Sequence, residues 1–128
     1  YALYSTSAGV EDVVRRGLEF ISPPRHYMDV PHAGRFLKSK SLVVLRPSNV
    51  ILVTLKLAED GEDIIARLYE CSGRQTGFNL TVAFPIREAR KVSADESQEY
   101  EKLAVRRNSV SGKLSPFEIV TLRLKLGG

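Results

Sequence analysis

The stretch NVILVTLKLAEDGEDIIARLYECSGRQTGFNLT, residues 49–81, decides the fold. Its first part, Val50–Leu57, alternates with a period of two, which is typical of a β-strand. One face holds Ile51, Val53, Leu55 and Leu57, and the other holds Val50, Leu52, Thr54 and Lys56. Because the second face becomes polar towards its end, we expect that end to meet water. Asp60-Gly61 then supplies a residue that tolerates positive φ, so a tight hairpin is predicted there.

A second strand and a second turn follow this hairpin. The segment Ile64–Cys71 predicts a strand that directs Ile64, Ala66 and Leu68 inward and Ile65, Arg67, Tyr69 and Cys71 outward. Ser72-Gly73-Arg74 turns the chain again, and residues 78–84 resume the alternation. Their apolar members are Phe78, Leu80, Val82 and Phe84. Such faces are unfavourable in water, so a second sheet or a neighbouring domain must cover them.

Helical spacing is found near the N-terminus, in Val10–Phe20. The residues that cluster on one side are Val10, Val13, Val14, Gly17 and Leu18. Two acidic residues, Glu11 and Asp12, lie in the first turn, where the helix dipole favours anions. Pro23-Pro24 ends the helix. Before the helix, Tyr1–Tyr4 is expected to be the end of a strand.

The remaining segments predict short strands separated by turns. They are Leu42–Leu45, Ile86–Val92 with Ala89 and Val92 inward, Tyr100–Val105, two short strands joined by a turn at Ser111-Gly112, and Phe117–Leu126. Short strands with frequent turn signals indicate an all-β fold, an antiparallel β-sandwich with one short N-terminal helix. We expect residues 1–37 to be a strand remnant, helix and loop leading from a preceding domain. Residues 38–128 are then a C-terminal β-sandwich.

Composition narrows the class of protein. A chain of 128 residues with 43% hydrophobic and 27% charged residues can bury a core without stabilising disulfide bonds. The one cysteine, Cys71, excludes an internal disulfide framework and favours a reducing compartment, so a cytoplasmic location is expected. No apolar run reaches the roughly 20 residues that span a bilayer. The chain begins at Tyr1 without a methionine, so it reads as an excised piece.

No catalytic, cofactor-binding or metal-binding residue can be assigned from the motifs. His26, Asp29 and His32 form an H-x2-D-x2-H run that could offer zinc ligands, but ordinary loop roles are favoured. Cys71 ends a strand with neither histidine near it in sequence, so a structural thiol is favoured over a nucleophile. The acids of the first hairpin read as a solvated turn rather than a facing pair of catalytic carboxylates; they are Glu59, Asp60, Glu62 and Asp63.

Two segments carry a resemblance to a known family. NVILVTLKLAEDGEDIIARLYECSGR and LSPFEIVTLRLKL resemble the C-terminal part of family 38 α-mannosidases of the glycoside hydrolases. The matching elements are the turn Glu59-Asp60-Gly61, the strand Arg67-Leu68-Tyr69-Glu70, the turn Ser72-Gly73-Arg74 and the final strand Pro116–Leu124. The segments Tyr1–Tyr4 and Val13–Phe20 also resemble the strand and helix that precede this tail.

The chain departs from the family pattern near its N-terminus. The family often continues Y-A-L-Y with P-H-x-G, where this chain has Ser5-Thr6-Ser7-Ala8-Gly9. It often has E-F-N-x-P, where this chain has Glu19-Phe20-Ile21-Ser22-Pro23.

The resemblance implies a parent enzyme that hydrolyses terminal α-mannosides with retention. In that family an aspartate nucleophile and a zinc ion belong to an N-terminal catalytic domain, and none of those motifs occurs here. The resemblance therefore implies a non-catalytic sandwich that supports the catalytic body, with the catalytic domain of the same polypeptide as partner and a homo-oligomer as a second candidate. No cofactor is expected in this piece, and neither nucleic acid nor membrane is expected as a partner.

Two other classes of function stay open. A carbohydrate-binding module would present exposed aromatic faces, for which Tyr27, Tyr69 and Tyr100 are the candidates, but there is no tryptophan. A nucleic-acid binder would suit the net charge of +4 and the pI of about 9.4. The basic residues are scattered, however, and no aromatic residues interleave with them.

Overall fold

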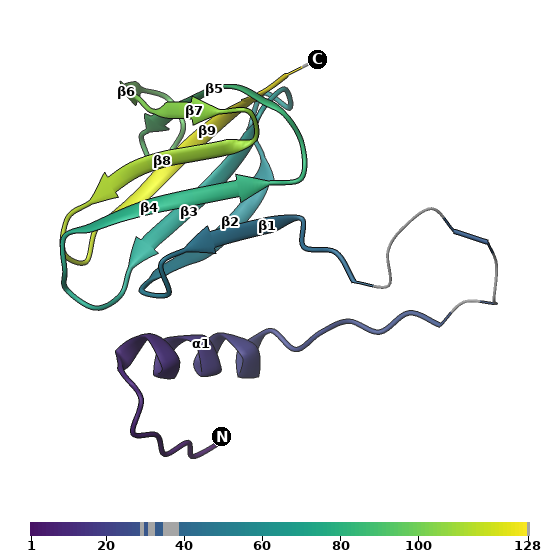
Figure 1. Cartoon of the computed structure of the whole chain (residues 1–128), viewed down its shortest axis with the longest axis vertical. Coiled ribbons are helices and arrows are strands. Elements are labelled where there is room, and N and C mark those ends of the chain that lie inside the picture. The colour runs from purple at the N-terminus through teal and green to yellow at the C-terminus, as the bar shows by residue number, and fades with distance from the viewer. Residues whose placement is uncertain (29, 31–32, 35–38, 128) are drawn as a thin grey trace. The chain divides into compact units, whose positions relative to one another are not determined.

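The structure is a computed structural model that describes residues 1–28, 30, 33–34 and 39–127. It divides into two compact units, Tyr1–Ser41 and Leu42–Gly128. The described residues form one helix and nine strands, and all nine strands belong to the second unit (Figure 1). The boundary predicted between residues 37 and 38 adjoins residues outside the described ones, so it stays a prediction.

The second unit is a sandwich of two antiparallel sheets, as the alternating pattern predicts (Figure 1). The four-stranded sheet has the order β1 (Val43–Arg46), β4 (Thr76–Val82), β8 (Ser109–Leu114), β7 (Ala104–Arg106). The five-stranded sheet has the order β2 (Val50–Leu57), β3 (Ile64–Glu70), β9 (Ile119–Leu126), β5 (Ile86–Val92), β6 (Glu99–Lys102).

The core lies between the two sheets and is built by alternate residues of each strand. From the four-stranded sheet it takes Phe78, Leu80, Val82, Val110 and Leu114, and from the other sheet Ala66, Leu68, Ala89, Val120, Leu122 and Leu124. The inward positions predicted for residues 64–68 and 78–84 are confirmed, with Ile64 and Phe84 only partly buried.

Both turns predicted in the central stretch are present. Gly61 has φ 78° and Gly73 has φ 70°, conformations in which any residue with a Cβ is strained. Gly73 has a second constraint, because a Cβ there would lie 2.7 Å from the ring of Phe117. The turn at residues 72–74 therefore requires glycine for both backbone and packing reasons.

The predicted faces of β2 are wrong beyond its third residue. Val50 pairs with Glu70 and Leu52 with Leu68, but the register shifts between Leu52 and Thr54, after which Leu55 pairs with Ala66. Residues that pair across two strands point to the same face of the sheet. Because Leu55 pairs with the core residue Ala66, the bulge places Leu55 on the core side instead of the opposite side. Thr54 and Lys56, which were expected to meet water, are half-buried, whereas Val53, Leu55 and Leu57 are exposed.

Ile65 is fully buried, although the alternation of β3 predicts that it points outward. Its ladder neighbours are Lys56 on β2 and Arg123 on β9. Both neighbours form ion pairs, Lys56 with Glu96 and Arg123 with Asp63. This ion-paired layer on the outer face of the sheet explains how an apolar side chain is buried away from the main core.

The predicted strand at 100–105 is two strands in different sheets. Residues 99–102 form β6 beside β5, and residues 104–106 form β7 beside β8. Leu103 joins them, is buried, and donates its backbone N–H to the carbonyl oxygen of Ala89 at 2.9 Å. The chain thus crosses from one sheet to the other at a single buried leucine.

The predicted turn at Ser111-Gly112 is also wrong, because both residues lie inside β8. A Cβ at Gly112 would lie 2.8 Å from the ring of Phe78, which packs against the glycine. A glycine within a strand can mark such a close approach rather than a turn. The actual turn precedes β8 and includes Arg107, whose φ is 54°.

The first unit contains the predicted helix, α1 (Val10–Ile21). Tyr4 and Thr6 donate hydrogen bonds from their hydroxyls to the carboxylate of Asp12, at 2.8 and 3.1 Å, and these bonds fold the N-terminal segment onto the first turn. The structure assigns no strand to residues 1–4, where the end of one was expected, and it describes no strand paired with them.

Candidate functional site

The residues first considered for chemistry do not converge in the structure. His26 is exposed in the first unit, while Asp29 and His32 lie outside the described residues. Cys71 is a buried thiol immediately after β3, as the structural interpretation expects. In the described part of the chain, no three side chains of His, Cys, Asp or Glu are grouped so that they could hold a metal ion.

The hairpin acids divide into two kinds. Glu59 and Glu62 are exposed, but Asp60 and Asp63 form ion pairs with Arg123, whose Nε donates to Asp63 at 2.6 Å. These bonds raise the pKa of Arg123, first through Asp60 and then through Asp63, so the guanidinium stays charged. The prediction of a solvated turn therefore fails for Asp63, which is buried and ties the hairpin to β9.

Glu70, at the end of β3, is a fully buried carboxylate for which the sequence motifs predict no functional role. Its Oε1 accepts bonds from Asn49 Nδ2 (2.8 Å) and from the backbone and hydroxyl of Ser72 (2.9 Å each). Its Oε2 accepts bonds from the backbone N–H groups of Gly73 (2.8 Å), Arg74 (3.2 Å) and Phe117 (3.0 Å).

Burial alone would raise the pKa of Glu70, but the bonds donated by Phe117, Asn49 and Ser72 lower it well below the ordinary value of 4.5. A carboxylate held ionised in this way cannot act as a general acid near neutral pH. Glu70 is therefore structural: it joins the turn at 72–74 to the turn before β9. The sequence signal that could have revealed it is an acid two residues before a Ser-Gly turn, where backbone N–H groups need an acceptor.

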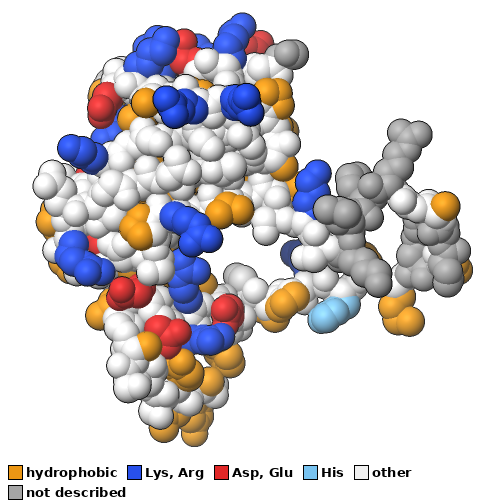
Figure 2. All heavy atoms as spheres, viewed as in Figure 1, with side chains coloured by type: hydrophobic (Ala, Val, Ile, Leu, Met, Phe, Trp, Pro, Cys, Tyr) orange, Lys and Arg blue, Asp and Glu red, His pale blue; other side chains and the backbone are white. Residues whose placement is uncertain are grey.

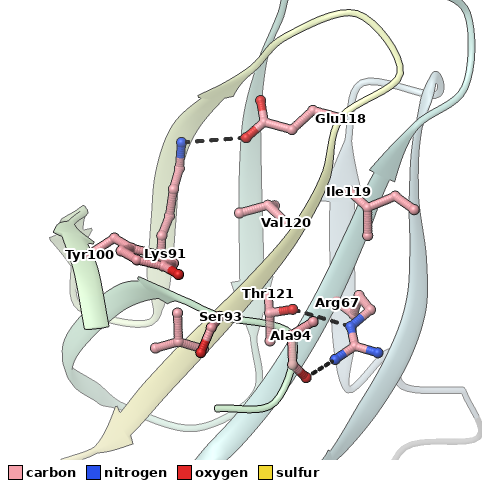
Figure 3. A pocket seen from close by; sticks show the side chains of 10 residues that line it. Arg67, Lys91, Ser93, Ala94, Tyr100, Glu118, Ile119, Val120 and Thr121 are labelled. Atoms are coloured by element: carbon pink, nitrogen blue, oxygen red, sulfur yellow. Dashed lines mark hydrogen bonds and ion pairs between the residues drawn. The ribbon is translucent and has the colours of Figure 1, made fainter. Parts of the chain in front are cut away.

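An open hollow of about 590 Å3 lies over the outer face of the five-stranded sheet, and Figure 3 shows it from close by. Its floor and sides come from β3, β9, β5, the loop after β5 and β6. This volume is within the range of small-ligand sites, although the hollow is open rather than enclosed.

Arg67 is held rigidly at one side of this hollow. Its Nε donates to Thr121 Oγ1 at 3.2 Å, and its Nη2 donates to the carbonyl oxygen of Ala94 at 2.7 Å (Figure 3). No bond from Nη1 is found within the described residues. The guanidinium is therefore oriented by the protein while part of its hydrogen-bonding capacity remains available.

Lys91 and Glu118 face each other at the other side, with Nζ and Oε1 separated by 4.0 Å (Figure 3). They form an ion pair, but this separation exceeds hydrogen-bond length, so no hydrogen bond joins the two groups. Other contacts fix both: Lys91 Nζ lies 3.1 Å from Glu101 and 3.3 Å from the carbonyl oxygen of Lys113, and Glu118 accepts the N–H of Ser115 at 2.6 Å.

The apolar surface of the hollow comes from Tyr100 and Ile119, which are 59% and 66% exposed. The other two candidate tyrosines do not share this site. Tyr69 is half-buried on β3, and Tyr27 belongs to the first unit. One aromatic ring therefore lines the hollow, beside two cationic groups and one carboxylate.

Two further surfaces are apolar and exposed. The edge strands β1 and β2 and the residue before β1 carry exposed apolar side chains that we call together the open edge: Leu42, Val44, Val53, Leu55 and Leu57. In the first unit, α1 buries none of its residues, and the segment 2–4 and the helix border an apolar groove. Figure 2 shows hydrophobic side chains gathered over this N-terminal segment.

Basic side chains are spread over the sandwich face shown in Figure 2 rather than gathered in one stripe. Several are paired with acids, among them Lys56 with Glu96 and Lys102 with Glu88. No helix within the described residues is long and apolar enough to cross a membrane.

Comparison with known families gives one finding. The family model described as "Glycosyl hydrolases family 38 C-terminal beta sandwich domain" matches residues 49–122, which is more than half of the chain. The matched region begins at β2 and ends within β9, so it includes eight of the strands in whole or part. A comparison with curated proteins finds no match.

Proposed function

The chain belongs to the family of glycosyl hydrolase family 38 C-terminal beta sandwich domains, and from this premise we propose that it is the non-catalytic supporting domain of a zinc-dependent, retaining α-mannosidase. The parent family consists of α-mannosidases. Zinc would be held by residues of the catalytic part, since the described residues of this chain offer no group of ligands for it. No catalytic step is assigned to this domain.

The observation that carries the proposal is the open edge. β1 has four residues and β2 has eight, so β1 alone is too short to cover the whole length of β2. Leu55 and Leu57 share their face with the core residue Ala66 and with Ile64, which packs against the core, yet they are 43% and 61% exposed. Covering such a side chain contributes about 1.5–3 kcal/mol, which a neighbouring domain would supply.

The helix provides a second argument for a covering partner. Val10, Val13, Phe20 and Ile21 are all more than half exposed, although their spacing is that of a buried helical face. A 12-residue helix is marginal by itself in water, because most helical stability in proteins comes from packing of the apolar face. We infer that this face also packs on the catalytic body.

Activity measurements test the non-catalytic role. The 128-residue chain is expected to show no turnover of an aryl α-mannoside in the presence of zinc, because the family resemblance assigns the nucleophile and the zinc ligands to a separate catalytic domain. The control is a longer polypeptide in which a catalytic domain precedes this sequence, which is expected to be active. Turnover by the isolated chain above a heat-denatured sample would contradict the proposal.

A self-sufficient carbohydrate-binding module is the weaker alternative. Such a module needs several aromatic platforms at one site, whereas only Tyr100 of the three candidate tyrosines lines the hollow. A cytoplasmic location and a homo-oligomer remain proposals: the first rests on the single cysteine, and the second on the same open edge.

A further inference from the structure

We propose that the outer face of the four-stranded sheet is a docking surface for an acidic segment of a protein partner, whose carboxylates pair with three separated cations on this face. The inference goes beyond the supporting role. It does not depend on the parent enzyme, because it rests on the charges and the register of this sheet alone.

The register of the four strands defines the residues of this face. Phe78 and Leu80 of β4 point into the core, so Asn79 between them points outward, and residues that pair across strands point to the same side. The outward residues, which we call the basic face, form two rows of four and one of two: Val44, Thr81, Ser109 and Arg106; Arg46, Asn79, Ser111 and Ala104; Gly77 and Lys113.

The basic face has three cations and no acid. Arg46, Arg106 and Lys113 are exposed, and no side-chain hydrogen bond or ion pair joins any of them to another described residue. The other sheet differs, because the ion-paired layer over Ile65 has an acid beside each of its cations. The positive charge of the basic face is therefore not neutralised within the domain, and a surface that carries carboxylates is its electrostatic complement.

Short polar side chains lie between these cations. Asn79 Nδ2 donates to Ser111 Oγ at 3.0 Å, Thr81 Oγ1 donates to Asn79 Oδ1 at 3.1 Å, and the hydroxyls of Thr81 and Ser109 lie 2.8 Å apart. The Ser111 hydroxyl accepts the bond from Asn79, so its own proton remains available to a partner. Figure 2 shows this side of the sandwich as a broad area of polar side chains and backbone with basic side chains around it.

The spacing of the cations selects an extended partner over a small anion. Neighbouring strands lie about 4.8 Å apart, and successive residues on one face of a strand about 6.7 Å apart. The register therefore places the Cα atoms of Arg46, Arg106 and Lys113 roughly 12–16 Å from one another. A single phosphate would have to draw three long side chains together, at a cost in side-chain entropy. Several carboxylates along a polypeptide match the spacing without this cost.

The basic face fits a protein better than a nucleic acid. None of its residues is aromatic, so it offers no ring on which a base could stack. Its cations lie at separate edges of the sheet rather than in a stripe that follows a phosphate backbone. Guanidinium groups, which Arg46 and Arg106 supply, bind carboxylates through two parallel hydrogen bonds.

Titration of the isotope-labelled 128-residue chain with a short poly-glutamate peptide tests this inference by amide NMR shifts at low ionic strength. We expect saturable shifts centred on residues 44–46, 77–81, 104–106 and 109–113, which diminish as salt is added. A single-stranded DNA of equal charge is the ligand control and is expected to bind more weakly. An absence of saturable shifts, equal shifts on the five-stranded sheet, or tighter binding of the DNA would overturn the proposal.

Two double variants separate docking at this face from attraction to the net charge. Arg46→Gln, Arg106→Gln is expected to weaken binding of the peptide by roughly fivefold, since two exposed ion pairs are lost. The matched control is Lys102→Gln, Lys125→Gln, which removes the same charge from the five-stranded sheet and should change the affinity by less than about twofold. Equal weakening in both double variants, with folding verified by the NMR spectra, would also overturn the proposal.

Discussion

At the scale of single residues, Glu70 is a buried polar group on which contacts between distant segments depend. Six donors from three separate segments end on one buried carboxylate. Glu70 is the last residue of the R-L-Y-E strand in the family pattern. Its carboxylate thus fixes both the turn at 72–74 and the start of β9. The link to the turn at 72–74 has a local signal in the sequence, but the link to Phe117 has none, because that donor lies 47 positions away.

Replacement of Glu70 by glutamine is expected to lower the free energy of unfolding by about 2–5 kcal/mol. The new amide group would face backbone N–H groups that are themselves donors, so buried donors would lose their acceptor. Urea denaturation measures the effect. Glu62→Gln, on the exposed part of the first hairpin, is the control and should change stability by less than about 0.5 kcal/mol.

The difference in unfolding free energy between the wild type and Glu70→Gln is expected to depend on pH. The folded protein holds the pKa of Glu70 below its ordinary value of 4.5, so its contribution to stability is present above that pH and is lost as the pH falls towards the folded value. The stability gap between the wild type and Glu70→Gln should therefore narrow as the pH falls from neutral to about 3. A gap of constant size would show that the carboxylate charge is not what the six donors stabilise.

At the scale of elements, the sequence predicts strands better than it predicts their faces. Strand positions follow from alternation and from turn residues, and both glycine turns of the central stretch were predicted for the right physical reason. The bulge in β2 leaves no such signal, because Val53 continues the alternation without a glycine or proline. Gly112 gives the opposite kind of error. The sequence predicts a turn at this glycine, but the residue lies within β8 and makes room for the ring of Phe78.

The open edge leads to a prediction about β2. The double substitution Leu55→Ser, Leu57→Ser should reduce the fluorescence of a bound hydrophobic dye and any self-association, because both side chains are exposed. It should lower the free energy of unfolding by less than Leu52→Ser, which removes a side chain packed against the core. Unchanged dye binding in the double variant would show that the open edge is not the apolar surface that a partner covers.

At the scale of the whole molecule, the layered architecture was predictable and the strand order was not. Apolar alternation on many short strands leaves a sandwich as the way to cover the faces, and the family resemblance points to the same fold. The order β1-β4-β8-β7 depends on pairings between distant segments, such as Val43 with Val82, which periodicity does not encode. The hollow depends on such pairings too, because its residues come from β3, β5, β6 and β9.

The division into two units predicts that the sandwich folds without the first one. The fragment 38–128 contains the whole core, so its free energy of unfolding should lie within about 1 kcal/mol of that of the full chain. The fragment 1–37 should be largely unfolded, since α1 buries none of its residues. Urea denaturation and circular dichroism of both fragments measure this.

Leu18→Pro in the full chain, which disrupts α1 at a cost of about 3 kcal/mol to the helix, should leave the unfolding of the sandwich unchanged. A sandwich that unfolds more readily in either case would mean that the N-terminal unit is part of its fold rather than a contact for a neighbouring domain.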